Sequence, residues 1–402
     1  MKILFLTLYN FASYYQKELC SDLLREFIDN GHLIYTVSPM ERKHHQNTRL
    51  IDEGRGKILQ VKVLNIRQAN IVEKTISTLT ISELFINAIN KYYKNVKFDV
   101  VIMTTPPITF YKIVKYIKLK HNAKIYLLLK DIFPQNALDI GLMKKTGISG
   151  LMYKFFENIE KKLYEISDYI GCISPANVDF ILKNNPSIKK NKVHVSPNSM
   201  QLTDLNIKDR TIIRKKYKIP LNKLVYIYGG NLGKPQAIDF VIECMKLSLT
   251  KHNDKHFIIC GTGTEYYKLE RFINQCNPIN ITLINGLPVN EYEDLLSASD
   301  VGLIFLDYRF TIPNIPSRLL SYMEYSKPIF ACTDKNTDLG NIIEENNLGW
   351  WCESKDPNEF NKIINNISVE DIKNKGINAR IFLENNYTTK IGYNIIMKEL
   401  GE

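Results

Sequence analysis

The chain repeats one local pattern, a short apolar strand followed by an amphipathic helix, along the whole of its first half. Strands interrupted by helices, and rich in Val, Ile and Leu throughout, predict a parallel sheet covered on both faces. The strands are expected at 2–9, 33–39, 58–64, 99–105, 124–131, 168–174 and 192–198, with helices near 14–30, 75–94, 108–120, 149–166 and 175–184.

The same pattern starts again after Pro197 and Asn198, which predicts two doubly wound α/β domains, 1–200 and 201–385. Ligands of such sheets bind outside the carboxyl ends of the strands, so the cleft between the domains is the expected active site. Strands are expected at 224–230, 256–262, 281–286, 300–306 and 328–334, helices near 237–250, 264–277, 290–298, 316–325, 358–366, 369–384 and 389–400, and a connection at 199–222.

Composition narrows the class of protein. An apolar content of 45% with 24% charged residues is typical of a soluble globular chain, and no apolar run approaches the roughly 18 residues of a membrane span. The first residues read as a strand instead of a signal peptide. Seven cysteines are scattered without a C-x-x-C pair, which favours reduced thiols in the cytoplasm and argues against a structural zinc site.

The positive charge of the chain is confined to its first half. Residues 1–200 hold 29 Lys and Arg against 17 Asp and Glu, whereas the rest hold 24 against 25. This asymmetry suggests that one domain faces something anionic, either a membrane surface or a phosphate-bearing lipid. No nucleic-acid-binding motif accompanies the charge. The alternative is that the composition of the genome favours lysine, in which case the charge excess has no functional meaning.

A glycine-rich turn, Gly229-Gly230-Asn231-Leu232-Gly233, joins an apolar strand to a helix and is followed by Lys234. Glycines let the backbone approach an anion, the exposed N–H groups donate to it, and the lysine adds a full charge. Pro235 replaces the Ser or Thr of a Walker loop, and the G-x-G-x-x-G spacing is absent. The turn therefore predicts a nucleotide phosphate held without an obligatory metal, with a plain tight turn as the alternative.

Five segments in a fixed order carry a family resemblance. Together they resemble the retaining family 4 glycosyltransferases of GT-B fold, in the bacterial branch that builds capsules and O-antigens, over about residues 1–385. The segments are NGHLIYTVSP (30–39), LLLKDIFPQNALDIG (127–141), VSPNS (195–199), GGNLGKPQAIDF (229–240) and IPSRLLSYMEYSKPIFA (315–331).

The resemblance implies an α/β fold of two Rossmann-like domains facing each other across a cleft, with 386–402 packing back on the first. It implies that a sugar moves from a UDP-sugar with retention, without a cofactor or essential metal, to a polyprenyl-diphosphate-linked saccharide. The donor sugar to try first is a HexNAc or a 6-deoxy-HexNAc such as FucNAc. The protein would be a hexosyltransferase-type enzyme in the cytoplasm, peripheral on the inner face of the plasma membrane.

The resemblance also assigns roles to single residues. Lys234 and Arg318 are expected to neutralise the departing diphosphate, and Asp131 to orient or deprotonate the acceptor, with an N-cap as its alternative. Plain turn chemistry competes at the glycines, and helix capping at Ser174 and Asn177. Expected donor-binding residues are Gly230, Asn231, Gly233, Gly261, Gly263, Asn285, Gly286, Asn314, Ser317 and Ser321, and acceptor-binding residues are Asn10, Ser13, Lys130, Ser174 and Asn177.

The chain also departs from the family pattern. Ser321 and Pro313 occupy the positions of the two glutamates expected around the donor, Lys130 replaces a common His, and the N-terminal Gly-Gly turn is absent. The alternatives are therefore a GT-B nucleotide-sugar 2-epimerase and a non-catalytic accessory subunit that binds nucleotide and lipid. For the anionic surface, the loop 41–49 and the helix around 108–121 are candidates, although a solvated lysine face is favoured for that helix.

Overall fold

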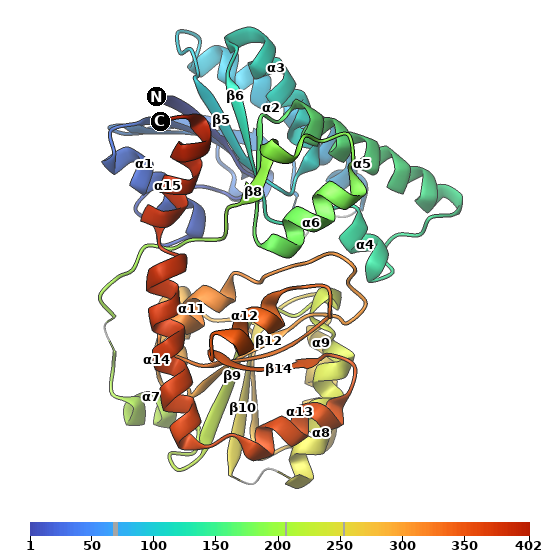
Figure 1. Ribbon diagram of the computed structural model, residues 1–402, viewed down its shortest axis with the longest axis vertical. Helices are drawn as coiled ribbons and strands as arrows, with labels where there is room; N and C mark the ends of the chain where they lie inside the picture. Colours follow the sequence, from blue (N-terminus) through green and yellow to red (C-terminus); the bar gives the residue numbers. More distant parts are fainter. Residues whose placement is uncertain (67–70, 206, 252–253) are drawn as a thin grey trace. The chain divides into compact units, whose positions relative to one another are not determined.

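The computed structural model describes residues 1–66, 71–205, 207–251 and 254–402. The chain divides into two units, each built on one sheet (Figure 1). Unit 1 comprises Met1–Gln201 and Thr389–Glu402, and unit 2 comprises Leu202–Thr388. The α/β class with two Rossmann-like units is therefore confirmed.

Unit 1 contains an eight-stranded sheet in the order β3-β4-β2-β1-β5-β6-β7-β8, parallel except for the β3–β4 hairpin. The strands are β1 (Lys2–Leu6), β2 (Leu33–Glu41), β3 (Arg49–Glu53), β4 (Gly56–Val63), β5 (Val100–Thr104), β6 (Lys124–Leu129), β7 (Tyr169–Cys172) and β8 (Val193–Val195). The helices are α1 (Leu19–Asp29), α2 (Ile71–Tyr92), α3 (Tyr111–His121), α4 (Gln135–Asp139), α5 (Gly147–Ile166), α6 (Pro175–Asn184) and α15 (Thr389–Leu400).

Unit 2 contains a six-stranded parallel sheet in the order β11-β10-β9-β12-β13-β14. The strands are β9 (Leu224–Asn231), β10 (Lys255–Thr262), β11 (Ile281–Ile284), β12 (Val301–Phe305), β13 (Ile329–Thr333) and β14 (Gly349–Glu353). The helices are α7 (Arg210–Lys216), α8 (Ile238–Lys251), α9 (Tyr266–Cys276), α10 (Val289–Ser297), α11 (Arg318–Glu324), α12 (Leu339–Glu345), α13 (Pro357–Asn366) and α14 (Val369–Asn386).

The last helix belongs to the unit that contains the first strand. The ring of Tyr393 on α15 packs edge-on against Phe27 of α1, with centroids 4.8 Å apart, and its hydroxyl lies 3.0 Å from Nε2 of His32. Where the chain returns to unit 1, the amide of Thr389 donates to the carbonyl of Met200 at 3.1 Å. The segment that leaves unit 1 and the segment that re-enters it are thus hydrogen-bonded neighbours.

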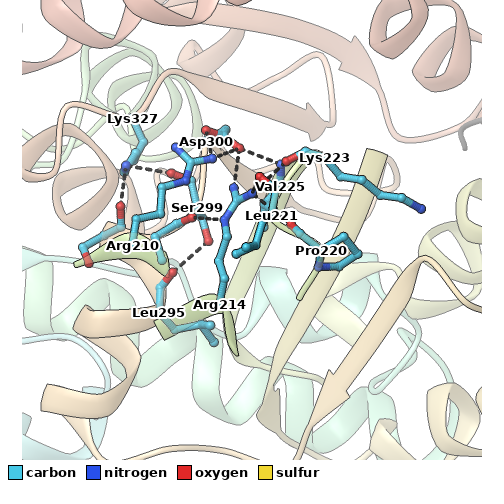
Figure 2. A network of polar contacts seen from close by, with 12 residues as sticks. Arg210, Arg214, Pro220, Leu221, Lys223, Val225, Leu295, Ser299, Asp300 and Lys327 are labelled. Atoms are coloured by element: carbon cyan, nitrogen blue, oxygen red, sulfur yellow. Dashed lines mark hydrogen bonds and ion pairs between the residues drawn. The ribbon is translucent and has the colours of Figure 1, made fainter. Parts of the chain in front are cut away.

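A buried ionic network ties α7 to the amino ends of β9 and β12 (Figure 2). The carboxylate of Asp300 accepts from Arg210 at 2.7 Å, from Arg214 at 2.9 Å and from the amide of Val225 at 2.8 Å. Arg214 is almost wholly buried and also donates to the carbonyls of Pro220, Leu221, Lys223 and Ala298. These strand ends are opposite to the carboxyl ends that bind ligands, so the network is structural.

Two further features concern the length of the helices and the state of the cysteines. In the part of the chain that the structure describes, no helix combines the length and apolarity that crossing a bilayer requires. All seven cysteines are free thiols, and the Sγ atoms of Cys332 and Cys352 lie 3.6 Å apart on adjacent strands.

Candidate active site

The glycine-rich turn lies at the carboxyl end of β9, where the order of strands in the unit 2 sheet reverses. Such a switch point is where open α/β sheets bind their ligands. Gly230 has φ +132°, a conformation that side chains disfavour, and a methyl carbon there would lie 2.9 Å from Nη2 of Arg318. Glycine is therefore required both for the backbone conformation and for the approach of the arginine.

A second glycine turn packs against the first. A Cβ atom at Gly261 would overlap the carbonyl oxygen of Gly230, and one at Gly263 would overlap that of Leu232. The amide of Leu232 also donates to the carbonyl of Thr262 at 2.8 Å. The two turns expected to bind the donor therefore form one backbone-to-backbone surface, made possible by the absence of side chains at these positions.

Side chains that the sequence analysis did not select hold the first turn in place. The hydroxyl of Tyr228 donates to the carbonyl of Asn231 at 2.6 Å. Oε1 of Gln236 accepts from Nδ2 of Asn231 at 2.7 Å and from the amide of Gly233 at 3.2 Å. Asn231 and Gly233 thus lie in the site, but their polar groups are partly used to rigidify the turn.

Arg318 begins α11 and places its guanidinium carbon 4.3 Å from the centroid of the Tyr228 ring. Its Nη1 atom is buried and has no hydrogen-bond partner among the residues that the structure describes. An unsatisfied buried donor costs about 1–3 kcal/mol, and more when it carries charge. Stacking on an aromatic ring leaves the in-plane N–H groups available, which suits a planar fork for phosphate oxygens.

Tyr322 lies one helical turn after Arg318 and connects α11 to β9 and β12 through hydrogen bonds. Its buried hydroxyl donates to the carbonyl of Leu303 at 2.9 Å and accepts from the amide of Gly229 at 3.4 Å. Desolvation by burial raises the pKa of Tyr322 to about 12, so the phenol is neutral at pH 7. The strands β9 and β12 are therefore linked to α11 through one phenol.

Lys234 lines a cavity of about 310 Å³ beside the amino end of α8, together with Lys268, Asp307 and Arg309. Arg309 is paired with Asp307 through two bonds of 2.8 and 2.6 Å, and Lys268 with Asp239 at 2.9 Å. The ammonium of Lys234 has no such pairing within the described residues.

Arg318 is not among the residues that line this cavity. The convergence of Lys234 and Arg318 on one diphosphate therefore stays a prediction.

The remaining donor-binding candidates are spread over three segments. Asn285 is exposed after β11, and Gly286, with φ +68°, lies against Thr262 at the end of β10. Ser317 is exposed directly before α11, and Ser321 is half-buried within it. The carbonyl of Asn314 accepts from Oγ1 of Thr337 at 2.9 Å, which anchors the loop before α11.

Glu324, the nearest acid to Ser321 along α11, does not replace the missing donor-binding glutamate. Its side chain is buried and Oε1 accepts from Oγ1 of Thr203 at 3.2 Å, while its carbonyl accepts from Arg380 at 2.9 Å. Glu324 therefore ties α11 to α14 and to the start of unit 2.

In unit 1, Lys130 and Asp131 follow β6 at its carboxyl end. Oδ1 of Asp131 accepts from the amide of Ile132 at 2.8 Å and Oδ2 accepts from Nδ2 of Asn136 at 2.7 Å. Burial raises the pKa of Asp131 to about 6 and lowers the pKa of Lys130 to about 8. Both groups therefore titrate close to neutral pH, as proton-transfer groups in active sites do.

The other acceptor-binding candidates are engaged in local structure. Oγ of Ser174 accepts from the amide of Asn177 at 3.4 Å as the N-cap of α6, and both side chains are buried. Oδ1 of Asn10 accepts from Nε2 of Gln60 at 3.0 Å, and Oγ of Ser13 accepts from the amide of Tyr15 at 3.1 Å. At Ser174 the capping interpretation is therefore the one that the structure shows.

The chain contains two doubly wound units, and in unit 2 an arginine that can bind an anion lies at the switch point of the sheet. These features define the class of protein, and a family comparison agrees with it. Residues 209–380 match the model of the family Glycosyl transferases group 1. The chain is a glycosyltransferase with the GT-B fold.

The sequence identity between this chain and individual relatives is low. Over 296 residues the chain is 25% identical to the probable glycosyltransferase WbjE of Pseudomonas aeruginosa, covering 73% of this chain and 72% of the relative. It is 22% identical to the putative colanic acid biosynthesis glycosyl transferase WcaI of Escherichia coli K12, covering 56% and 54%. Among solved structures, Anabaena HepE in complex with UDP-glucose aligns with a TM-score of 0.68 at 13% identity, covering 100% and 99% of the two chains.

Proposed function

We propose that this enzyme transfers a sugar, with retention of anomeric configuration, from a UDP-sugar to a lipid-linked saccharide during synthesis of a bacterial surface polysaccharide. The named relatives support the polysaccharide context, since one is described as acting in colanic acid biosynthesis. The structural neighbour solved with UDP-glucose supports a uridine nucleotide donor. The donor sugar to try first remains a HexNAc or its 6-deoxy form.

One observation carries this proposal: the guanidinium of Arg318, stacked on Tyr228, presents a buried and unpartnered nitrogen beside the backbone of Gly230. A pyrophosphate placed against the glycine turn would accept from this nitrogen and from the main-chain amides. Charge-assisted hydrogen bonds of this kind are about twice as strong as neutral ones. They would be strongest where the leaving diphosphate gains negative charge.

Catalysis would rest on stabilising that leaving group. In a retaining transfer on one face of the sugar, the bond from the anomeric carbon to the diphosphate breaks while the acceptor oxygen approaches from the same side. Fixed cationic and amide groups around the departing oxygen lower the barrier because they need no reorganisation. Arg318 and Lys234 would supply this charge, and no metal would be required.

On the acceptor side, Asp131 would accept a hydrogen bond from the attacking hydroxyl and take its proton as the new glycosidic bond forms. Its carboxylate is held by Ile132 and Asn136, and a pKa of about 6 leaves it mostly ionised at pH 7. Lys130 would contact the phosphate or hydroxyl groups of the acceptor, since its ammonium forms no hydrogen bond or ion pair within the described residues.

A thermal-shift panel of UDP-, GDP-, ADP- and CDP-sugars tests the donor first, because ligands that bind the folded state raise its melting temperature. We expect UDP-sugars alone to raise it. Turnover is then measured as UDP release from the best ligand, with and without a polyprenyl-diphosphate-linked saccharide. Stimulation by the acceptor, with formation of an extended lipid-linked product, is the expected result.

Three outcomes would contradict the proposal. An isomerised sugar nucleotide without transfer would identify a 2-epimerase, and nucleotide binding without any turnover would identify an accessory subunit. A melting temperature that rises equally with all four nucleotides would reject the uridine assignment.

A further inference from the structure

Helix α5 of unit 1 exposes a continuous stripe of large apolar side chains. Ile148, Leu151, Met152 and Phe155 are 79, 70, 51 and 53% exposed. Their spacing of three and four residues places them on one face of the helix. The opposite face is fixed in the protein by the buried residues Gly150, Tyr153, Glu160 and Tyr164. The orientation of α5 therefore presents the stripe outward, where single exposed apolar residues are common but a row of four is not.

The surroundings of the stripe are basic. Leu142, in the segment before α5, is 61% exposed and extends the apolar surface. Lys144, Lys145 and Lys154 are exposed next to it, and the stretch 140–156 contains no acidic residue. We call Leu142, the four stripe residues and these three lysines the α5 surface. It combines an apolar centre with a basic rim.

Helix α3, which the sequence analysis considered for the same purpose, has a different character. Lys112 pairs with Glu83 at 2.9 Å, and Lys118 pairs with Asp168 at 2.8 Å. Lys120 donates to Oδ1 of Asn90 at 2.6 Å. Of its apolar residues, Ile113, Val114 and Ile117 are buried and Leu119 is exposed. Three of its four lysines are thus engaged within the protein.

We propose that the α5 surface docks on an anionic lipid bilayer, with Leu151 and Phe155 entering the boundary between headgroups and acyl chains and the lysines contacting lipid phosphates. An amphipathic helix with an apolar face and flanking lysines binds in this way. The inference rests on the proposed function in that a lipid-linked acceptor lies in such a bilayer.

A second copy of the chain is a poorer occupant of the surface. In a twofold dimer the same patch meets itself, so the lysines of both copies would approach each other. Like charges facing across an interface oppose association, whereas lipid phosphates would neutralise them.

Vesicle sedimentation of the full chain tests the proposal, with vesicles of phosphatidylcholine containing 30% phosphatidylglycerol compared with phosphatidylcholine alone. We expect the wild type to sediment with the anionic vesicles, and Leu151→Ser/Phe155→Ser to lower the partition coefficient at least about tenfold. Lys144→Ser/Lys145→Ser should lower binding to the anionic vesicles severalfold. Both variants change exposed side chains, so the melting temperature should stay near that of the wild type.

The matched control is Ile377→Ser/Ile381→Ser, which removes two apolar residues, 48 and 50% exposed, one turn apart on α14. This variant should bind vesicles as the wild type does. Equal sedimentation of the wild type and Leu151→Ser/Phe155→Ser would overturn the proposal, as would an absence of vesicle binding together with a dimer that Leu151→Ser/Phe155→Ser dissociates. The stabilisation by UDP-sugar is measured on the same samples, so a failure of lipid docking is distinguished from a failure of the proposed function.

Discussion

The guanidinium carbon of Arg318 lies 4.3 Å from the centre of the Tyr228 ring, so a charge from the start of α11 rests on the aromatic ring of a residue in β9. The same phenol donates to the carbonyl of Asn231 and so holds the glycine turn. One residue thereby fixes both the cation and the backbone amides that would surround a diphosphate.

Replacement of Arg318 is expected to reduce turnover with little loss of folding. Arg318→Ala should lower kcat/KM for UDP release about a hundredfold or more, because it removes charge from the leaving group. Arg318→Lys should recover only part of this loss, since an ammonium cannot form the planar fork. Steady-state kinetics on both variants, with the exposed Arg271→Ala as control, measure the effect. Wild-type rates in Arg318→Ala would remove this residue from the mechanism.

A methyl group at Gly230 should abolish donor binding specifically. Gly230→Ala introduces both an unfavourable φ and a carbon 2.9 Å from Nη2 of Arg318. Gly54→Ala, where φ is +73° and no atom lies within 4 Å, isolates the backbone effect. Each variant should lose about 1–2 kcal/mol of stability, but only Gly230→Ala should lose the UDP-induced rise in melting temperature. A normal rise in Gly230→Ala would place the diphosphate elsewhere.

The two lysines of the 310 Å³ cavity allow the role of Lys234 to be tested. Lys268 is paired with Asp239 and Glu265, whereas no partner of the Lys234 ammonium is found in the described residues. If Lys234 turns toward the donor, Lys234→Ala lowers turnover about a hundredfold, and Lys268→Ala leaves it unchanged. Equal, small effects of the two substitutions in the UDP-release assay would leave Arg318 as the cation that acts alone.

Loss of Arg214 should destabilise unit 2 strongly. Arg214→Met leaves four backbone carbonyls without their donor and weakens the compensation of Asp300, which should cost about 3–5 kcal/mol. Arg210, which is half-exposed and bonds only Asp300 in this network, provides the control. Urea unfolding should show a much smaller loss in Arg210→Met. Similar midpoints for the two variants would contradict the structural role given to the buried arginine.

The pKa of Asp131 predicts how the rate depends on pH. Burial raises this pKa to about 6, so a carboxylate that accepts the acceptor proton is lost as the pH falls through 6, and the rate should fall about tenfold per pH unit below it. Asp131→Asn should be slow at all pH values and lack this limb. Because the folded state holds the proton more tightly than the unfolded chain, Asp131 lowers stability as the pH rises from about 4 to 6, and Asp131→Asn should remove this loss. An unchanged acidic limb in Asp131→Asn would exclude it as the titrating group.

Most of the sheet framework could be predicted from the sequence because parallel strands buried on both faces leave long apolar runs. The exceptions are elements without such a signal. The edge strand β3 is mostly exposed, so it lacks a periodic apolar pattern, and α7 lay hidden in a polar segment interpreted as a connection. Helix α12 and strand β14 were also missed, the strand because its two adjacent tryptophans are only half-buried.

The site was predicted less completely than the fold. Gly230, Gly261 and Gly263 predict close approaches of the backbone to its neighbours. In the structure a Cβ atom at each of these positions would lie too close to a neighbouring atom. Tyr228 and Gln236 were missed because a tyrosine in a strand and a glutamine after a proline have no distinctive pattern of their own.

The hydrogen bond between Thr389 and Met200 has a practical consequence for dissecting the molecule. Since the outgoing and returning segments adjoin, residues 202–388 form an insertion that can be excised from its host as one continuous piece. A linker of a few residues joining Gln201 to Thr389 would then close the gap and retain α15 on the host. Acceptor recognition could in this way be assayed on a truncated protein that contains no donor turn.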